Sequence, residues 1–172
     1  ALKAGAYKCE VKGVEELHSS NGKKFIKISL DIVEGEFKNY FSNKYENDTR
    51  TDKKWSGIWN LFLEGYEAGS INTKFKGFIT SIEKSNVGFI WDWNEQHLTN
   101  KVVGIVFREE EFKANDGSIK SSAKPYYAVA VNELDNVKIP EPKLLEGELG
   151  SMSYSGTKNS DFDTFAGDDL PF

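Results

Sequence analysis

Cysteine, histidine and proline are scarce in this chain of 172 residues, which has one cysteine, two histidines and four prolines. Because Cys9 is alone, no intrachain disulfide can form, which suits a reducing cytoplasm. The sequence has no CxxC pair for a metal, no Gly-Lys-Ser/Thr phosphate loop and no GxSxG nucleophile motif. We therefore expect no enzyme activity, no metal site and no cofactor.

Long apolar runs are also lacking. No stretch approaches the ~20 residues that a membrane-spanning helix needs. The first residues contain no apolar segment of the kind found in a signal peptide. We therefore expect a cytoplasmic location and no membrane partner.

Positive charge is in the minority, since 22 Lys and Arg residues face 27 Asp and Glu residues and give a net charge of −5. The excess acid is concentrated at the end of the chain, where residues 151–172 hold four aspartates and one lysine. The remainder is close to neutral and has basic loops, with Lys23, Lys24 and Lys27 in an acid-free stretch. Such loops can bind a polyanion with moderate, salt-sensitive affinity.

Alternation of apolar and polar residues predicts three strands near the N-terminus. The first covers residues 7–17 and the second residues 24–33, and Asn21-Gly22 between them is a strong hairpin-turn signal. The aromatic-rich segment 37–45 is predicted as the third strand. Three consecutive strands joined by tight turns form a meander.

The period then changes to that of helices. Apolar spacing predicts an amphipathic helix over residues 55–66, with Trp55, Trp59 and Phe62 on its buried face. A shorter helix follows, with an apolar face that runs from Phe75 to Ile82. The two segments form a helical insert.

Two further strands are predicted over residues 101–112 and 126–131, while the apolar segment 87–93 is a strand or a loop. The order of three strands, a helical insert and two strands is that of the OB-fold. The sequence therefore predicts a mainly β protein: a five-stranded OB-fold barrel with a helical insert between strands 3 and 4. An open α+β sheet would give a similar pattern.

The composition shifts after Pro140-Glu141-Pro142, and residues 147–160 are rich in Gly and Ser, as in a flexible linker. We therefore expect one domain over residues 1–142 and a flexible linker with a disordered acidic tail over residues 143–172.

The chain ends in Asp168-Asp169-Leu170-Pro171-Phe172. This ending resembles the acidic tip of bacterial and phage single-stranded DNA-binding proteins, through which they recruit other proteins. The chemistry suits such a role, because Phe172 can fill a pocket while its terminal carboxylate pairs with a basic side chain. The resemblance implies that these five residues bind replication or recombination proteins.

Parts of the body resemble phage-type members of the same family: Gly-Ala-Tyr-Lys-Cys-Glu-Val, Ser-Asn-Gly-Lys-Lys-Phe-Ile-Lys-Ile, Gly-Ile-Val-Phe-Arg-Glu-Glu-Glu-Phe and Val-Asn-Glu-Leu-Asp-Asn-Val-Lys-Ile-Pro-Glu-Pro. The resemblance implies an OB-fold that coats single-stranded DNA in a bacterial host cell with little sequence preference. It leaves open whether the chain forms a homo-oligomer.

A sequence-tolerant interface needs a basic groove for phosphates and aromatic faces on which bases stack. OB-folds bind on strands two and three, between the first hairpin loop and the loop that joins strands four and five. These positions nominate Lys23, Lys24, Phe25, Lys27, Tyr40, Lys44, Tyr45, Lys113, Lys120, Lys124 and Tyr126 or Tyr127, one of the two tyrosines pointing inward.

Two other functions remain open from the sequence. Trp91 and Trp93 share one face if their segment is a strand, which would suit a carbohydrate- or peptide-binding β-module with an incidental tail. A structural phage or mobile-element protein could also carry such a tail without binding DNA.

Overall fold

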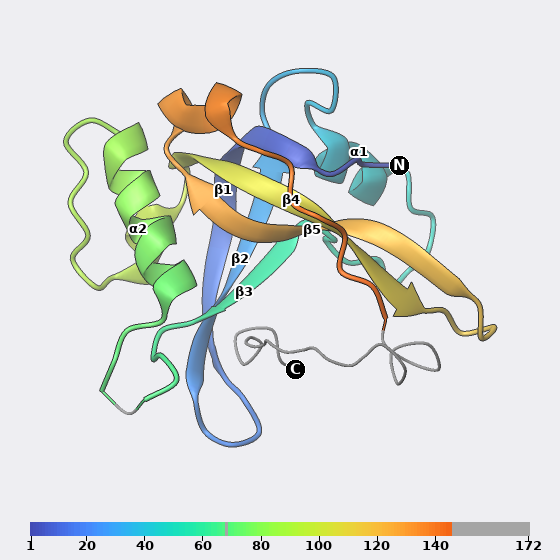
Figure 1. The fold of residues 1–172 in the computed structure, drawn as a ribbon, viewed down its shortest axis with the longest axis horizontal. Helices are drawn as coiled ribbons and strands as arrows, with labels where there is room; N and C mark the ends of the chain where they lie inside the picture. The colour runs from blue at the N-terminus through green and yellow to red at the C-terminus, as the bar shows by residue number, and fades with distance from the viewer. Residues whose placement is uncertain (68, 146–172) are drawn as a thin grey trace.

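The computed structural model describes residues 1–67 and 69–145. The five-residue tip and the expected linker from residue 146 onward lie outside these residues. The described part is mainly β, and Figure 1 shows a curved sheet flanked by helices. Its elements are β1 (Gly5–His18), β2 (Lys24–Ile32), α1 (Tyr40–Glu46), β3 (Ile58–Phe62), α2 (Thr73–Ser85), the 3-10 helix η1 (Glu95–Leu98), β4 (Val102–Lys113), β5 (Ile119–Val129) and the 3-10 helix η2 (Val131–Asn136).

The five strands form one antiparallel sheet in the order β3-β2-β1-β4-β5. Among the described residues no ladder joins β3 to β5, so the sheet is not closed into a barrel. The prediction of a mainly β chain with five strands is therefore confirmed in this coarser form.

The third strand predicted over residues 37–45 is wrong, because this segment forms a turn and then α1. The cause is Asp31, which is buried in β2. Its carboxylate accepts hydrogen bonds from the backbone N–H groups of Phe41 at 2.9 Å and Ser42 at 3.1 Å. These donors belong to the first turn of α1, where no intrahelical acceptor exists, so Asp31 stabilises a helix at this point.

The long helix predicted over residues 55–66 is also wrong, because its centre is β3. This strand pairs with β2 from Phe25↔Phe62 to Ser29↔Ile58. A short apolar run fits both the helical and the strand period. The segment forms a strand because it can pair with the open edge of β2. Trp59 and Phe62 are both buried as expected, and Trp59 belongs to the central cluster.

The other predicted elements are present with shifted ends. The shorter helix is α2, and Asn72 caps it by accepting hydrogen bonds from the N–H groups of Lys74 and Phe75. The last strand begins at Ile119 rather than Tyr126. The segment 87–93 is a loop, not a strand.

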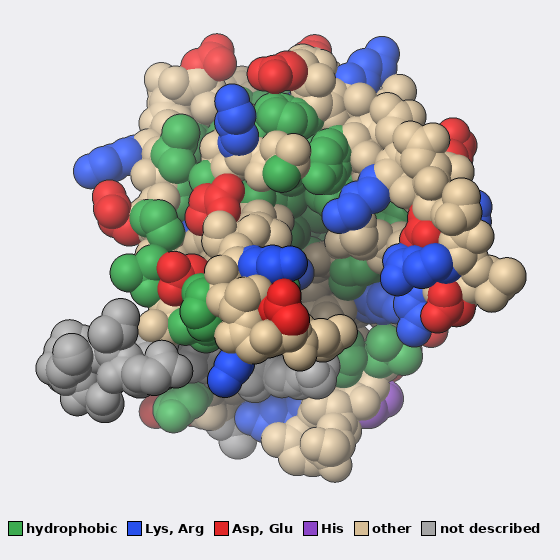
Figure 2. Space-filling model, turned by 90° about the vertical axis from the view of Figure 1, so that its right-hand side faces the viewer, with side chains coloured by type: hydrophobic (Ala, Val, Ile, Leu, Met, Phe, Trp, Pro, Cys, Tyr) green, Lys and Arg blue, Asp and Glu red, His purple; other side chains and the backbone are tan. Residues whose placement is uncertain are grey.

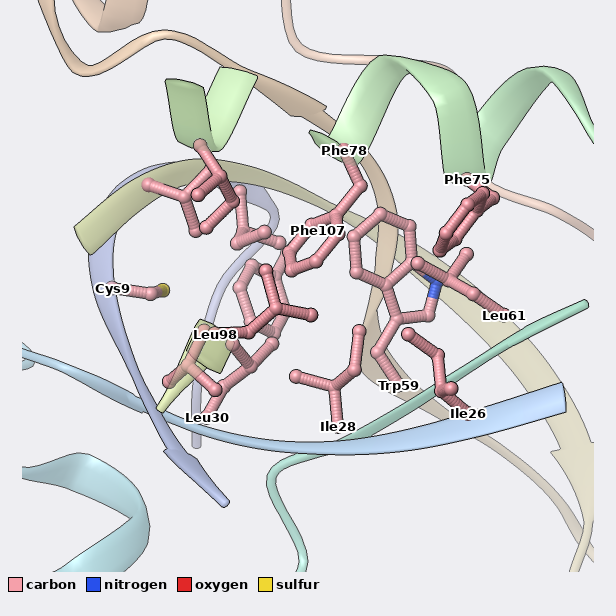
Figure 3. Packing of buried hydrophobic residues seen from close by; sticks show 14 of the residues in the cluster. Cys9, Ile26, Ile28, Leu30, Trp59, Leu61, Phe75, Phe78, Leu98 and Phe107 are labelled. Carbon is pink, nitrogen blue, oxygen red and sulfur yellow. The ribbon is translucent and has the colours of Figure 1, made fainter. Parts of the chain in front are cut away.

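The core lies between α2 and the inner face of the sheet (Figure 3). Phe78 of α2 meets Trp59 of β3 edge to face, with 5.7 Å between ring centroids. Phe107 of β4 and Ile28 of β2 are wholly buried beside them. Cys9 is buried in the same cluster, and its burial raises the pKa of the thiol well above the usual range.

The chain after η2 returns along the sheet. Lys143 donates its N–H to the Glu109 carbonyl at 2.8 Å, and its own carbonyl accepts the Glu111 N–H at 2.9 Å. These bonds form a parallel bridge to β4. The paired part of the chain therefore extends beyond Pro142, where we expected the linker to begin.

No helix in the described residues has both the length and the apolar character required to cross a membrane.

Candidate nucleic-acid interface

The outer face of β2 and β3 carries two of the predicted residues, Phe25 and Lys27. Their partners in the register are Phe62 and Asn60, so the four side chains lie on the side away from the inward-facing Ile26 and Ile28. The rings of Phe25 and Phe62 are 5.4 Å apart. Phe25 and Phe62 are both buried, so this face combines a buried aromatic pair with a lysine and an amide.

The hairpin loop between β1 and β2 holds the other predicted lysines. Gly22 has φ 86°, which suits the turn, and Lys23 beside it is exposed. Lys24 pairs with Glu16 of β1 at 3.2 Å. Lys23 and Lys27 have no ion pair within the described residues. These two lysines therefore contribute more positive potential than Lys24.

Residues 108–124 form a two-stranded ribbon that extends away from the body (Figure 1). Alternation sorts its side chains onto two faces. We call one the cationic face, and it presents Arg108, Glu110, Phe112, Lys120, Ser122 and Lys124. The other face presents Glu109, Glu111, Lys113, Ile119, Ser121 and Ala123. The cationic face thus has three positive charges and one negative charge.

Two predicted ribbon lysines, Lys120 and Lys124, lie on the cationic face, but Lys113 lies on the opposite face with two glutamates. The sequence analysis missed Arg108, because it stands in front of three glutamates. Alternation counted from the inward-facing Phe107 could have separated Arg108 from the neighbouring Glu109.

Tyr126 lies where the ribbon joins the body, next to an irregularity in the β4–β5 ladder. Its ring is covered by two cations, with Arg108 Cζ 3.8 Å and Lys74 Nζ 3.9 Å from the centroid. Tyr126 and Tyr127 are both partly buried and touch, with 5.6 Å between centroids. The expectation of one inward and one outward ring assumed regular alternation, which the bulge interrupts.

Tyr40, Lys44 and Tyr45 lie on α1 and not on a third strand, so they form a separate group. Tyr40 packs partly against the core, and its hydroxyl accepts a hydrogen bond from the Leu2 N–H at 3.3 Å. The ring of Tyr45 lies 5.9 Å from that of Trp55. The structure therefore does not bring these three residues onto the pairing face of β2 and β3.

Figure 2 shows the side of the molecule that lies on the right in Figure 1. Lys and Arg side chains gather on the right of this view with Asp and Glu side chains among them, and hydrophobic side chains are exposed above. The positive potential is therefore local, in agreement with a net charge of −5. A strong salt dependence is expected of any polyanion bound there.

The loop after α2 presents Trp93, which is 61% exposed. Its φ of 67° is unusual for a bulky residue. Asp92 supports the loop by accepting the Asn94 N–H at 3.1 Å and pairing with His97 Nδ1 at 2.8 Å. The hydrogen bond from Asn94 is the main reason why the pKa of Asp92 is lowered. Trp91 packs against Trp93, and its Nε1 is buried without a hydrogen-bond partner in the described residues.

No group of three or more His, Cys, Asp and Glu side chains in the described part of the chain is placed to hold a metal ion. Comparison of the sequence with protein-family models and with curated proteins finds no match.

Proposed function

We propose that this chain binds single-stranded DNA with little sequence preference and coats it during replication or recombination in a bacterial cytoplasm. The observation that carries the proposal is the sorting of the ribbon into a cationic face, which also carries the ring of Phe112, and a separate acidic face. Cations that follow a backbone, interleaved with aromatic rings, suit a single strand, whose phosphates and base faces are both accessible.

The strand order supports an OB-type fold as the finer description. Pairing of β3 with β5 would turn the order β3-β2-β1-β4-β5 into a closed five-stranded barrel, and α2 stands between strands three and four. OB-folds are partly open barrels that bind oligonucleotides on strands two and three and on the two flanking loops. Phe25 and Lys27 lie on β2, and the ribbon contains the loop between β4 and β5, which supports a binding site of this kind.

The acidic tip is the proposed site for partner proteins. Phe172 and its carboxylate provide the anchor, and Asp168 and Asp169 favour a basic pocket. This part of the proposal rests on the resemblance of the last five residues to the tips of single-stranded DNA-binding proteins. In this proposal, the body of the chain binds DNA and the tip binds a partner protein.

The proposal is tested by fluorescence anisotropy with labelled oligo-dT and with a duplex of the same length. We expect clear preference for oligo-dT, with a log–log salt slope of about −0.7 per phosphate neutralised. Equal affinity for the two DNAs, or no binding to either, would contradict it.

A second candidate function, a carbohydrate- or peptide-binding module, is favoured by the exposure of Trp93. An exposed indole held by Phe75 and Trp91 is a suitable platform for a sugar ring or an apolar side chain. Trp93→Ala separates the candidates. Loss of binding on a glycan and peptide array, with oligo-dT affinity unchanged, would favour the module.

A further inference from the structure

We infer that the indole of Trp93 forms a stacking platform for one nucleobase, at the place where the outer face of β2 and β3 ends. The inference deepens the proposed function and rests on it. It extends the interface to the loop between α2 and η1. It also assigns Trp93, on which the second candidate function depends, to the path of the DNA.

The exposed ring of Trp93 is supported by two other aromatic rings. Phe75 is buried and points from α2 into the core (Figure 3), and its ring lies 6.4 Å from that of Trp93 with 33° between the planes. The ring of Trp91 lies 5.7 Å from Trp93 and 6.1 Å from Phe75. Trp93 itself is 61% exposed, so much of its indole faces water. A flat, supported ring that faces solvent is a surface on which a base can stack.

Hydrogen bonds within the loop hold the backbone of Trp93 in place. Asp92 accepts the Asn94 N–H at 3.1 Å and pairs with His97 Nδ1 at 2.8 Å. Asn94 in turn caps η1 by accepting the Gln96 N–H at 3.0 Å. Between Asp92 and Asn94, Trp93 has a φ of 67°, a left-handed conformation that is costly for a bulky side chain. A ring that is fixed in advance loses little conformational entropy when a ligand stacks on it.

The same hydrogen bonds indicate the class of ligand. The polar side chains on either side of Trp93, Asp92 and Asn94, are already bonded to groups of the loop itself. A sugar ring needs hydrogen-bond partners for its hydroxyl groups beside the aromatic platform. A base can bind through its face alone. The surroundings of Trp93 therefore favour a nucleobase over a sugar.

The platform is continuous with the proposed DNA-binding face. Phe62 lies on that face and is the last residue of β3. The carbonyl of the next residue, Leu63, accepts the Asn72 N–H at 2.8 Å, which fixes the start of α2 against the end of β3. Phe75, which supports Trp93, lies in the first turn of this helix. A single strand that leaves the outer face of β3 at Phe62 therefore has Trp93 at the end of its path.

Two features of the loop oppose stability. Trp93 has the left-handed backbone, and Trp91 Nε1 is buried without a hydrogen-bond partner in the described residues. Costs of this kind are typical of functional sites, where they are offset elsewhere in the fold.

The test compares the oligo-dT affinity of the wild type with that of Trp93→Ala and Trp93→Phe, by fluorescence anisotropy over a range of salt concentrations. Trp93→Ala should weaken binding about tenfold, because it removes one stacked base. Its log–log salt slope should equal that of the wild type, because stacking releases no counterions. Trp93→Phe keeps a flat ring and should bind within about twofold of the wild type.

Ile90→Ala is the matched control, because Ile90 is an exposed apolar side chain of the same loop without an aromatic face. It should bind oligo-dT as the wild type does. Intrinsic fluorescence gives an independent readout, since Trp93 is the most exposed of the four tryptophans. Oligo-dT should quench this fluorescence in the wild type, and Trp93→Phe should lose most of the quenching. Thermal melting of each variant checks that the fold is retained.

An unchanged affinity in Trp93→Ala would overturn the platform, while oligo-dT binding by the wild type would leave the proposed function intact. The platform would also be overturned if Ile90→Ala weakened binding as much as Trp93→Ala, or if Trp93→Phe kept the full quenching. If Trp93→Ala lost binding only on a glycan and peptide array, Trp93 would belong to the second candidate function. A wild type that does not bind oligo-dT would contradict the proposed function and the platform together.

Discussion

The two halves of β4 differ although they belong to one strand and pair with the same neighbour. Residues 102–107 have β1 on their other edge and bury Val103, Ile105 and Phe107 completely. Residues 108–113 have β5 on one edge and a single bridge to Lys143 on the other, and their side chains are largely polar. The transition falls between Phe107 and Arg108, where pairing with β1 ends. The comparison indicates that the first half provides stability and that the second half is available for a ligand.

The largest expected effect is on the buried half. Phe107→Ala should lower the free energy of unfolding by about 3–5 kcal/mol, because it leaves a cavity among Tyr7, Phe41 and the inner face of the sheet. Phe112→Ala is the control from the ribbon, where the ring is 43% exposed, and should cost less than about 1 kcal/mol. Urea denaturation measures both. Similar losses would show that the two halves do not differ in stability.

The next effect concerns the carboxylate that joins the buried sheet to α1. Asp31→Ala should cost about 2–3 kcal/mol, because it leaves the buried N–H group of Phe41 and the partly buried N–H group of Ser42 without an acceptor. Asp48→Ala is the matched control. Its side chain is partly buried rather than fully buried, and hydrogen bonds from Arg50 lower its pKa to about 2. The midpoint of urea denaturation is measured for both variants. If it falls by the same amount in Asp31→Ala and Asp48→Ala, this role of Asp31 is contradicted.

Substitutions on the ribbon should have a smaller effect, and this effect should be on the free energy of DNA binding and not on that of unfolding. Lys120→Ala combined with Lys124→Ala should weaken oligo-dT binding about tenfold at low salt, since each lysine neutralises a phosphate. The melting temperature should stay the same, because both side chains are exposed. Lys113→Ala, from the acidic face, should bind nearly as the wild type does. If Lys113 mattered as much as the pair, the assignment of the two faces would be incorrect.

The smallest effect is a pH dependence in the core. Burial keeps the Cys9 thiol protonated in the folded protein, whereas in the unfolded chain it ionises near its ordinary pKa of about 8.5. The pKa of the thiol is higher in the folded protein than in the unfolded chain. The contribution of Cys9 to the free energy of unfolding is therefore fully present below the pKa of the unfolded chain, and it is lost as the pH rises above that value.

Between pH 8 and 9.5 the loss attributable to Cys9 should be about 1 kcal/mol, from the ionisation of the unfolded chain. Urea denaturation of the wild type and of Cys9→Ala over this range isolates the contribution. Identical pH profiles, or rapid reaction of the native thiol with a thiol reagent at pH 8, would contradict the burial of Cys9.

The sequence predicts the strands and helix whose patterns are local. β1, β2, β4 and α2 carry a clear period, and their apolar faces coincide with the core. The two wrong predictions depend on distant contacts. α1 needs the carboxylate of Asp31, ten residues before Phe41, and β3 needs the open edge of β2. Neither contact can be deduced from the period of the segment itself.

The candidate site shows the same distinction between features that follow from a local pattern and features that depend on distant contacts. Alternation along residues 24–33 places Phe25 and Lys27 on the face opposite Ile26 and Ile28, and the register agrees. The location of Lys113 depends on the register of β4 with β5, and the surroundings of Tyr126 depend on a bulge. The pairing of Lys74 with Tyr126 joins residues from α2 and β5, and no sequence pattern connects them.

The central claim, that a single strand lies along the outer face of β2–β3 and the cationic face of the ribbon, is tested most directly by NMR titration with oligo-dT. The account predicts that the amides of Lys27, Asn60, Arg108 and Lys124 shift together and saturate at one ratio of strand to protein. Shifts confined to the loop around Trp93, or no shifts at all, would contradict it.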